Sequence, residues 1–383
     1  MQRSNGKRLA SALMSTVFVV SSLMTVLPAY AAAAGEEKLL CTDDGFTYIV
    51  NDDDTVTIKG YKSEEENGRF AGEFLNLPDT IDGKTVTAID SGTQFRDLGF
   101  TEIHLPAQVE TISDWAFAGN DGLKEVTIPA TVKTAERPFT YAASLEKVVF
   151  EDGITELPES ILSCTDFTSV TVPDSVTKIN RSAFDGNSKL EEVHIPDSVT
   201  YIDGRAFTGC TALKILDLPD SLDYIGYYAF AETTSLESVT IPAAWNFQPD
   251  GNDFFALSGV KEVTFENGRT TIPPGIFPGC EKLETINYPE GVTKIGSGAF
   301  KNCPSLKNPK LPGTVEEIES FAFQNCSGIE HLDLPSSLTT IGVNAFFGLT
   351  GLKYLYVPHD INNSPERLIM PLGSPLTEKW EAR

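Results

Sequence analysis

The feature that most constrains the fold is an internal repeat that runs through most of the chain. Short apolar segments recur from Leu105 to Val357, with 22 to 24 residues between successive anchor positions. Two units end in Phe150 and Phe265 and continue into a Glu-x-Gly turn. Such a fixed period indicates a solenoid, in which each unit buries its apolar side against its neighbours. In the other units a proline follows the anchor: Ile128-Pro129, Val172-Pro173, Ile195-Pro196, Leu218-Pro219, Ile241-Pro242, Tyr288-Pro289, Leu311-Pro312, Leu334-Pro335 and Val357-Pro358.

A second column of residues follows the same period. In the segment 123–128, Val126 and Ile128 alternate with Thr127, the pattern of a half-buried strand, and Pro129 then ends the strand. We expect the recurring aromatics to stack inside the coil, adding about 0.5–1.5 kcal/mol per pair beyond area burial. This column, with Ile161 as its single interruption, comprises Phe117, Phe139, Phe184, Phe207, Phe230, Phe254, Phe277, Phe300, Phe323 and Phe346.

The repeat resembles the BspA-type bacterial leucine-rich repeat. Units such as residues 199–213, with the sequence VTYIDGRAFTGCTAL, match its pattern nearly throughout. The resemblance covers residues 84–358 and implies a leucine-rich repeat solenoid of about twelve rungs. It implies a right-handed, β-rich coil with one short parallel strand per rung on the concave face. Short turns or single helical turns would form the convex side.

The two ends of the chain depart from the repeat. A basic start, an apolar run over residues 9–27 and the small-x-small site Ala29-Tyr30-Ala31 predict a signal peptide over residues 1–33. A membrane anchor is the alternative, but serines weaken the run as a permanent span. Residues 34–83 are expected to form an N-terminal cap with a β-hairpin at 44–60. Residues 359–383 are expected to form a C-terminal cap or tail.

The charge restricts the kinds of partner. The chain carries a net charge of −25, and loss of the basic leader would make it more negative. Such a surface repels nucleic acid and anionic lipid. We therefore expect a secreted or cell-surface protein, monomeric, with no nucleic-acid partner and no transmembrane segment after cleavage of the leader.

The six cysteines fall into two groups. Cys164, Cys210, Cys280, Cys303 and Cys326 share one repeat position, three residues after the column residue. We interpret them as small buried side chains; disulfides are the alternative, but stacked strands hold such side chains about 4.8 Å apart. Cys41 stands alone in the cap and is the predicted reactive thiol.

The sequence predicts neither catalysis nor a cofactor or metal. It contains no nucleophile-elbow, zinc-protease or phosphate-loop motif. His104 and His194 lie several rungs apart, and Asp52-Asp53-Asp54 fits a hairpin turn better than a calcium loop. A secreted enzyme with its site in a cap is the least favoured alternative.

Two places could bind a partner. Among the outward strand positions, His331 and Asp333 are followed one rung later by Tyr354 and Tyr356, residue types favoured in interfaces. Packing of both tyrosines against the C-terminal cap is an equal alternative. Trp245 and Phe247 lie in the longest unit, where we expect them to replace missing core aliphatics; the alternative is an exposed aromatic contact.

The function follows from the resemblance. BspA-type proteins imply adhesion to extracellular proteins, either host matrix proteins such as fibronectin or fibrinogen or proteins of other cells. A glycan-binding module, with Trp245, Tyr354 and Tyr356 as exposed rings, is the alternative. Burial of these rings would argue against it.

Overall fold

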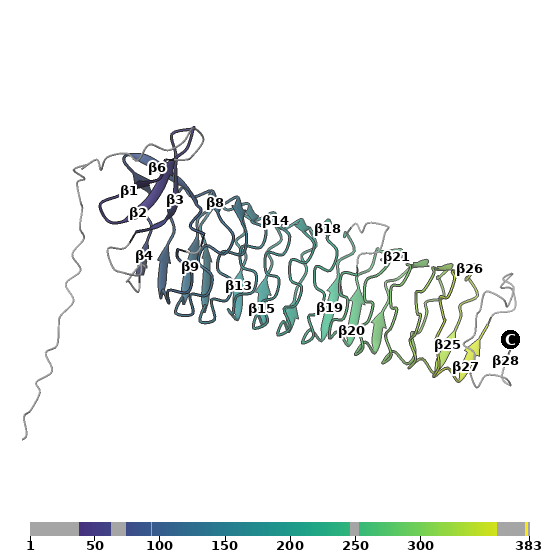
Figure 1. Ribbon diagram of the computed structural model, residues 1–383. Helices are drawn as coiled ribbons and strands as arrows, with labels where there is room; N and C mark the ends of the chain where they lie inside the picture. The colour runs from purple at the N-terminus through teal and green to yellow at the C-terminus, as the bar shows by residue number, and fades with distance from the viewer. Residues whose placement is uncertain (1–37, 63–73, 93, 246–252, 358–379, 382–383) are drawn as a thin grey trace, which may run out of the picture.

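The computed structural model describes residues 38–62, 74–92, 94–245 and 253–357, and the backbone of 380–381. Over these residues the chain is a β-solenoid of about 11 turns with two ladders of parallel strands (Figure 1). Of the predicted features, the leader, Phe247 and, apart from the backbone of 380–381, the C-terminal cap or tail lie outside the described residues. The predicted leucine-rich repeat solenoid is confirmed.

The described N-terminal part is a small sheet that continues into the coil. Strands β2 (Phe46–Val50) and β3 (Val56–Tyr61) form the hairpin, and β1 (Leu40–Cys41) pairs antiparallel with β2. Strand β3 pairs in parallel with β6 (Lys84–Ile89), which β5 (Thr80–Ile81) also contacts. The cap sheet therefore shares β6 with the ladder of short strands that is described below.

The long-strand ladder is built from the predicted strands before each proline. Its inward residues, such as Val193 of one strand and Leu216 of the next, are buried, whereas Glu192 and His194 are exposed. The strands are β4 (Phe74–Asn76), β7 (Glu102–His104), β9 (Glu125–Ile128), β11 (Lys147–Phe150), β13 (Ser169–Thr171), β15 (Glu192–His194), β17 (Ile215–Leu216), β19 (Ser238–Ile241), β20 (Glu262–Phe265), β22 (Thr285–Asn287), β25 (His331–Asp333), β27 (Tyr354–Tyr356) and β28 (Trp380–Glu381).

A second ladder of two-residue strands lies along another side of the coil (Figure 1). The expectation of one strand per rung was therefore wrong. Each of these strands ends in a buried apolar residue, such as Ile202 or Ile225. Only the one residue before it also takes part in the strand pairing. After β6 this short-strand ladder comprises β8 (Thr111–Ile112), β10 (Thr134–Ala135), β12 (Glu156–Leu157), β14 (Lys178–Ile179), β16 (Tyr201–Ile202), β18 (Tyr224–Ile225), β21 (Thr271–Ile272), β23 (Lys294–Ile295), β24 (Glu317–Ile318) and β26 (Thr340–Ile341).

Turns, not helices, join the two ladders in every described rung. In the rung of Phe207, Arg205 and Gly209 have left-handed φ values of 59° and 71°. A right-handed helix cannot pass through two such residues four positions apart. The turn backbone is satisfied by the next rung instead, because the N–H groups of Arg205, Phe207 and Gly209 donate to three carbonyl oxygens at 2.7 to 2.9 Å: those of Tyr227, Ala229 and Ala231.

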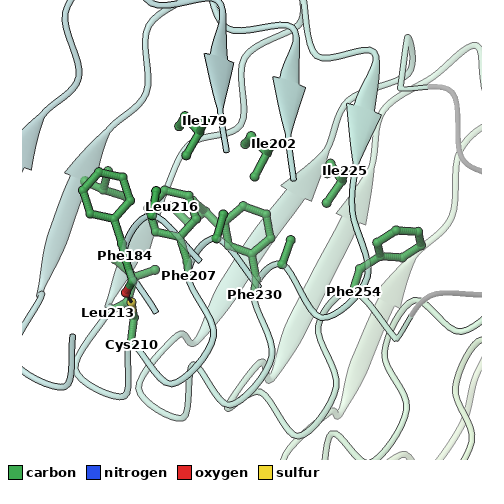
Figure 2. Close-up of a cluster of buried hydrophobic side chains, with 14 of the residues drawn as sticks. Ile179, Phe184, Ile202, Phe207, Cys210, Leu213, Leu216, Ile225, Phe230 and Phe254 are labelled. Carbon is green, nitrogen blue, oxygen red and sulfur yellow. Dashed lines mark hydrogen bonds between the residues drawn. The ribbon is translucent and has the colours of Figure 1, made fainter. Parts of the chain in front are cut away.

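The aromatic column stacks inside the coil as expected (Figure 2). Ring centroids of Phe184 and Phe207 lie 5.0 Å apart, and those of Phe207 and Phe230 lie 5.2 Å apart. The next member is Phe255, 5.1 Å from Phe230, so the assignment of Phe254 was wrong. Phe254 occupies the position that alanine has in neighbouring rungs, because the extra residues of this unit precede both phenylalanines.

The interruption of the column is Leu162, not Ile161. The N–H of Leu162 donates to the carbonyl of Ala183, as the N–H of Phe184 does to that of Ala206. Cys164 is consequently two residues after the column, at a left-handed position with φ 55°, where its side chain is exposed. Its assignment to the cysteine position was wrong, and Thr165 is buried there instead.

Four cysteines do occupy the predicted buried position, and all six cysteines are free. Each buried thiol donates to the carbonyl of the column residue one rung earlier; Cys210 contacts Phe184 O at 3.2 Å, and Cys326 contacts Phe300 O at 3.0 Å. The amide of Asn187 makes the equivalent bond to Leu162 O at 2.9 Å. Most rungs place a small hydrogen-bond donor at this position, as cysteine, asparagine, threonine or serine, whereas Ala142 and Leu349 fill it without a donor.

Both ladders are divided into blocks. The long-strand ladder ends after β11, β17 and β22, and the short-strand ladder ends after β10 and β18. Between β22 and β25, buried Pro309 stands where other rungs have an inward Val or Ile. Proline has no N–H for the ladder, and Lys310 beside it is left-handed with φ 44°, so no strand forms in this rung.

Candidate binding surfaces

The long-strand face, defined as the outward residues of the long-strand ladder, brings together four predicted residues at its C-terminal end. In β25 and β27, His331 pairs with Tyr354 and Asp333 pairs with Tyr356. The His331 and Tyr354 rings stack with centroids 4.5 Å apart and an interplanar angle of 23°. Tyr354 is 50% exposed, and Tyr356 is half-buried. We call the stacked side chains of His331 and Tyr354 the aromatic step.

Salt bridges between neighbouring rungs border this face. Lys353 Nζ lies 2.8 Å from Glu330 Oε2, and its hydrogen bond and charge lower the pKa of that carboxyl below its usual value. The same arrangement joins Lys214 to Glu191 at 2.7 Å and Lys261 to Glu237 at 2.6 Å. These groups are exposed, so each pair contributes little to stability. Their effect is to fix charge positions beside the strands.

Trp245 lies in the core and cannot serve as an exposed contact. Its side chain is 2% exposed, and its ring meets Phe254 edge to face at 4.8 Å. The expectation that Trp245 fills the core is confirmed, and the alternative of an exposed aromatic contact at Trp245, which made it a candidate partner-binding residue, is wrong. The sequence could not decide this, because the burial of Trp245 depends on a residue one rung later.

That residue is Arg269, which the sequence analysis missed. Its guanidinium carbon lies 5.8 Å from the Trp245 ring, and its Nη2 donates to the carbonyl oxygens of Pro242 (2.7 Å), Ala243 (3.2 Å) and Trp245 (2.7 Å). Burial lowers the pKa of Arg269. The sequence did indicate an unusual rung here, since Arg269 occupies the repeat position that is apolar in other rungs, as at Val292 and Leu222. These three bonds tie its guanidinium to the backbone around Trp245, so it supports this turn.

A second aromatic cluster lies on the short-strand side, where Tyr228 is exposed and Tyr201, Tyr224 and Tyr227 are half-buried. We define the tyrosine patch as Tyr201, Tyr224, Tyr227 and Tyr228. Tyr201 and Tyr224 stack across β16 and β18 with centroids 4.3 Å apart, and Tyr227 and Tyr228 follow in the next turn. The sequence analysis missed this patch because it considered only outward positions of the long strands.

The structure gives few groupings suited to catalysis. Over the described ranges, no three His, Cys, Asp or Glu side chains converge to hold a metal ion. His104 pairs only with Glu102, at 2.5 Å, and His194 is exposed on a distant strand. In the same part of the chain no helix is long and apolar enough to cross a membrane.

Comparison with known proteins assigns the family. Six copies of the model for the BspA type leucine-rich repeat region match residues 87–214, 177–248 and 250–369. The chain belongs to the BspA-type leucine-rich repeat family. No curated protein sequence matches this BspA-type chain.

The BspA-type chain is similar to several solved structures. A Bacteroides ovatus leucine-rich repeat protein matches with a TM-score of 0.50 and 26% identity, over 82% of this chain and 94% of that one. A leucine-rich cell surface protein of Faecalibacterium prausnitzii has a TM-score of 0.46 and 22% identity, over 88% and 98% of the two chains. The pneumococcal vaccine antigen PcpA has a TM-score of 0.41 and 19% identity, over 88% and 86%.

Proposed function

We propose that this chain is an exported binding protein, secreted or held at the cell surface, that engages another extracellular protein and has no catalytic activity. Its finer role is that of an adhesin toward host matrix proteins or proteins of other cells. Family membership supports a binding role, because repeat solenoids present extended surfaces on which the contact residues can vary. The basic, apolar and small-residue order of residues 1–33 supports export.

The observation that carries the proposal is the aromatic step at β25 and β27. Tyr354 is half exposed, yet its ring is held by stacking on His331 and by parallel pairing of its strand on both sides. A rigid aromatic loses little conformational entropy when a partner covers it, which is why tyrosine recurs in binding energy hot spots. Asp333 and the Lys353–Glu330 pair supply a polar rim.

The glycan alternative on this face is weakened. It required Trp245, Tyr354 and Tyr356 as exposed rings, and Trp245 is buried. Two rings remain, one of them half-buried. A protein partner, which can use the polar rows along the strands as well as the rings, fits this face better.

The test is binding of purified residues 34–383 to immobilised fibronectin, fibrinogen, other matrix proteins and mucins. The site variant is Tyr354→Thr/Tyr356→Thr, because threonine occupies outward strand positions elsewhere, as at Thr285 and Thr264. A matched control is Thr127→Ala/Thr171→Ala, on the same face near its other end. Light scattering on the same samples checks that the protein is monomeric.

We expect saturable binding to a protein, weakened roughly tenfold or more in the site variant and unchanged in the control. Equal binding by both variants would move the site away from β25 and β27. Failure to bind any protein, with the unfolding temperature unchanged, would overturn the adhesin role. Mass spectrometry of secreted protein from cells carrying the full chain tests cleavage after Ala31 or Ala33.

A further inference from the structure

We propose that the tyrosine patch is a second binding surface, which takes an uncharged oligosaccharide. It lies on the short-strand side of the middle rungs, whereas the aromatic step lies on the long-strand side at the C-terminal end (Figure 1). The two surfaces are therefore separate, and the patch does not depend on the protein-binding role proposed for the long-strand face.

The patch has rings fixed in place by the coil. Tyr201 and Tyr224 are paired in register across β16 and β18, and their rings are within 11° of parallel. Tyr227 lies against the backbone of the preceding rung, since a Cβ atom on Gly204 would come within 2.8 Å of its Cε1. Tyr228 meets Tyr227 edge to face with centroids 6.0 Å apart. Because these rings are already held in place, a ligand would bind them with little loss of side-chain conformational entropy.

The rings carry polar groups that can bond sugar hydroxyls. Burial and the charge of Asp203 raise the pKa of Tyr201 to about 12, so its hydroxyl remains a donor through the physiological range. The hydroxyl of Tyr228 donates to Asp253 Oδ2 at 3.1 Å. The tyrosine hydroxyls can thus exchange hydrogen bonds with sugar hydroxyls, and the exposed ring of Tyr228 adds apolar surface for the C–H groups of a sugar.

Charged groups surround the patch. Three cations lie over its rings: Lys178 Nζ 5.0 Å from Tyr201, Arg181 5.7 Å from Tyr227 and Arg205 6.0 Å from Tyr228. Carboxylates outnumber them: Asp203 acts on Tyr201, Asp253 contacts Tyr228, Glu156 lies 4.0 Å from Lys178, and Asp185 lies near Arg205 and Glu232. This excess of carboxylates opposes a polyanion, whereas the mixture of hydrogen-bond donors and acceptors complements a neutral polyhydroxyl ligand.

Other rungs show what the same positions hold when no patch is formed. The place of Tyr224 is taken by Thr271 and Thr340, that of Tyr227 by Ser297 and Ser320, and that of Tyr228 by Asn344. The fold thus accepts small polar residues at each site, although Trp115 and Phe321 show that the place of Tyr228 also takes a large ring. Three tyrosines together in a single rung are not needed for the coil, and a ligand accounts for their grouping.

These replacements give the test. The triple variant Tyr224→Thr/Tyr227→Ser/Tyr228→Asn uses residues already accepted at each position, and its unfolding temperature checks the fold. Calorimetry would measure binding of cellohexaose, mannohexaose and chitohexaose, with hexagalacturonate as the acidic counterpart, at low and high salt. The control is Tyr354→Thr/Tyr356→Thr, on the other face. If the triple variant does not fold, Tyr227→Ser/Tyr228→Asn, confined to the turn, replaces it.

We expect the wild-type chain to bind at least one neutral hexasaccharide with an affinity that does not change with salt. The patch variant should lose roughly tenfold or more in affinity, and the control should bind as wild type. The proposal is overturned if no neutral hexasaccharide binds, if the patch variant binds equally well, or if hexagalacturonate alone binds and salt abolishes it. Loss of protein adhesion in the control, with sugar binding intact, would separate the two surfaces.

Discussion

The rung of Phe207 and the rung of Trp245 solve the same packing problem in different ways. In the first, Val199 and Ile202 fill the interior beside a stacked phenylalanine, and alternate N–H groups of the turn are bonded to the next rung. In the second, an extra residue displaces the column to Phe255, and Trp245 fills the space beside Phe254. Buried Arg269 then satisfies carbonyls that the irregular turn leaves without a neighbour. Regular rungs rely on apolar repetition, whereas the irregular rung relies on one charged side chain.

The largest effect should come from breaking a regular rung. Phe207→Ala removes a fully buried ring that stacks on Phe184 and Phe230. We expect a loss of about 3–5 kcal/mol in the free energy of unfolding, measured by chemical denaturation. The control is Phe347→Ala, one residue after a column phenylalanine but exposed on the surface. A loss below about 1 kcal/mol for Phe207→Ala would mean that the stack contributes little.

A smaller effect is expected where the irregular rung is made to resemble the regular ones. Arg269→Val restores the residue type of the other rungs but leaves the carbonyls of Pro242 and Trp245 without their donor. We expect a loss of about 2–3 kcal/mol, because buried unsatisfied polar groups are costly. The parallel change Val292→Leu, at the same position of the next rung, is the control. If Arg269→Val stabilised the protein, the arginine would not be the support of the Trp245 turn.

The smallest effect concerns the donor that links the two kinds of rung. Cys280 donates to Phe255 O at 3.2 Å and lies 3.3 Å from the hydroxyl of Ser258, and burial raises its pKa to about 12. Cys280→Ala should lower the free energy of unfolding by about 1 kcal/mol, the typical net contribution of one hydrogen bond.

In the folded wild type, a maleimide reagent should label Cys41 and Cys164, which are exposed, and spare the four buried thiols. Rapid labelling of Cys280 at neutral pH would contradict this.

Sequence periodicity predicted the long strands and most of the aromatic column, because a repeated rung imposes the same burial on the same position. It failed at Ile161 and Phe254, where two adjacent apolar residues compete for one place. The turn decides between them through its left-handed residues, which are Ser160 and Cys164 in one rung and Asp253 and Leu257 in the other; Cys164 and Leu257 stand where Gly186, Gly209 and Gly279 are found in other rungs. These residue types do not predict a positive φ, so the spacing alone could not decide which of the two adjacent residues joins the column.

The surfaces were predictable in part for a related reason. His331, Asp333, Tyr354 and Tyr356 were found because strand alternation tells outward from inward residues. The short-strand ladder has only two residues per strand, too few for any alternation, so Tyr201 and Tyr224 gave no such signal. The burial of Trp245 depended on Arg269, a contact between rungs that lies 24 residues away in sequence.

The division of the ladders also has a mechanical meaning. Between the rung that contains β10 and β11 and the rung that contains β12 and β13, both ladders end at the same boundary. The stack of phenylalanines is interrupted there as well, by Leu162. Elsewhere the described interruptions are staggered, so one ladder carries load across a gap in the other. We therefore expect a pull along the axis, as flowing liquid exerts on a tethered molecule, to part the coil first at residues 151–153, where turn bonds such as those from the N–H groups of Arg137 and Tyr141 to Ser160 O and Cys164 O cross the gap in both ladders, leaving each side folded as its own segment.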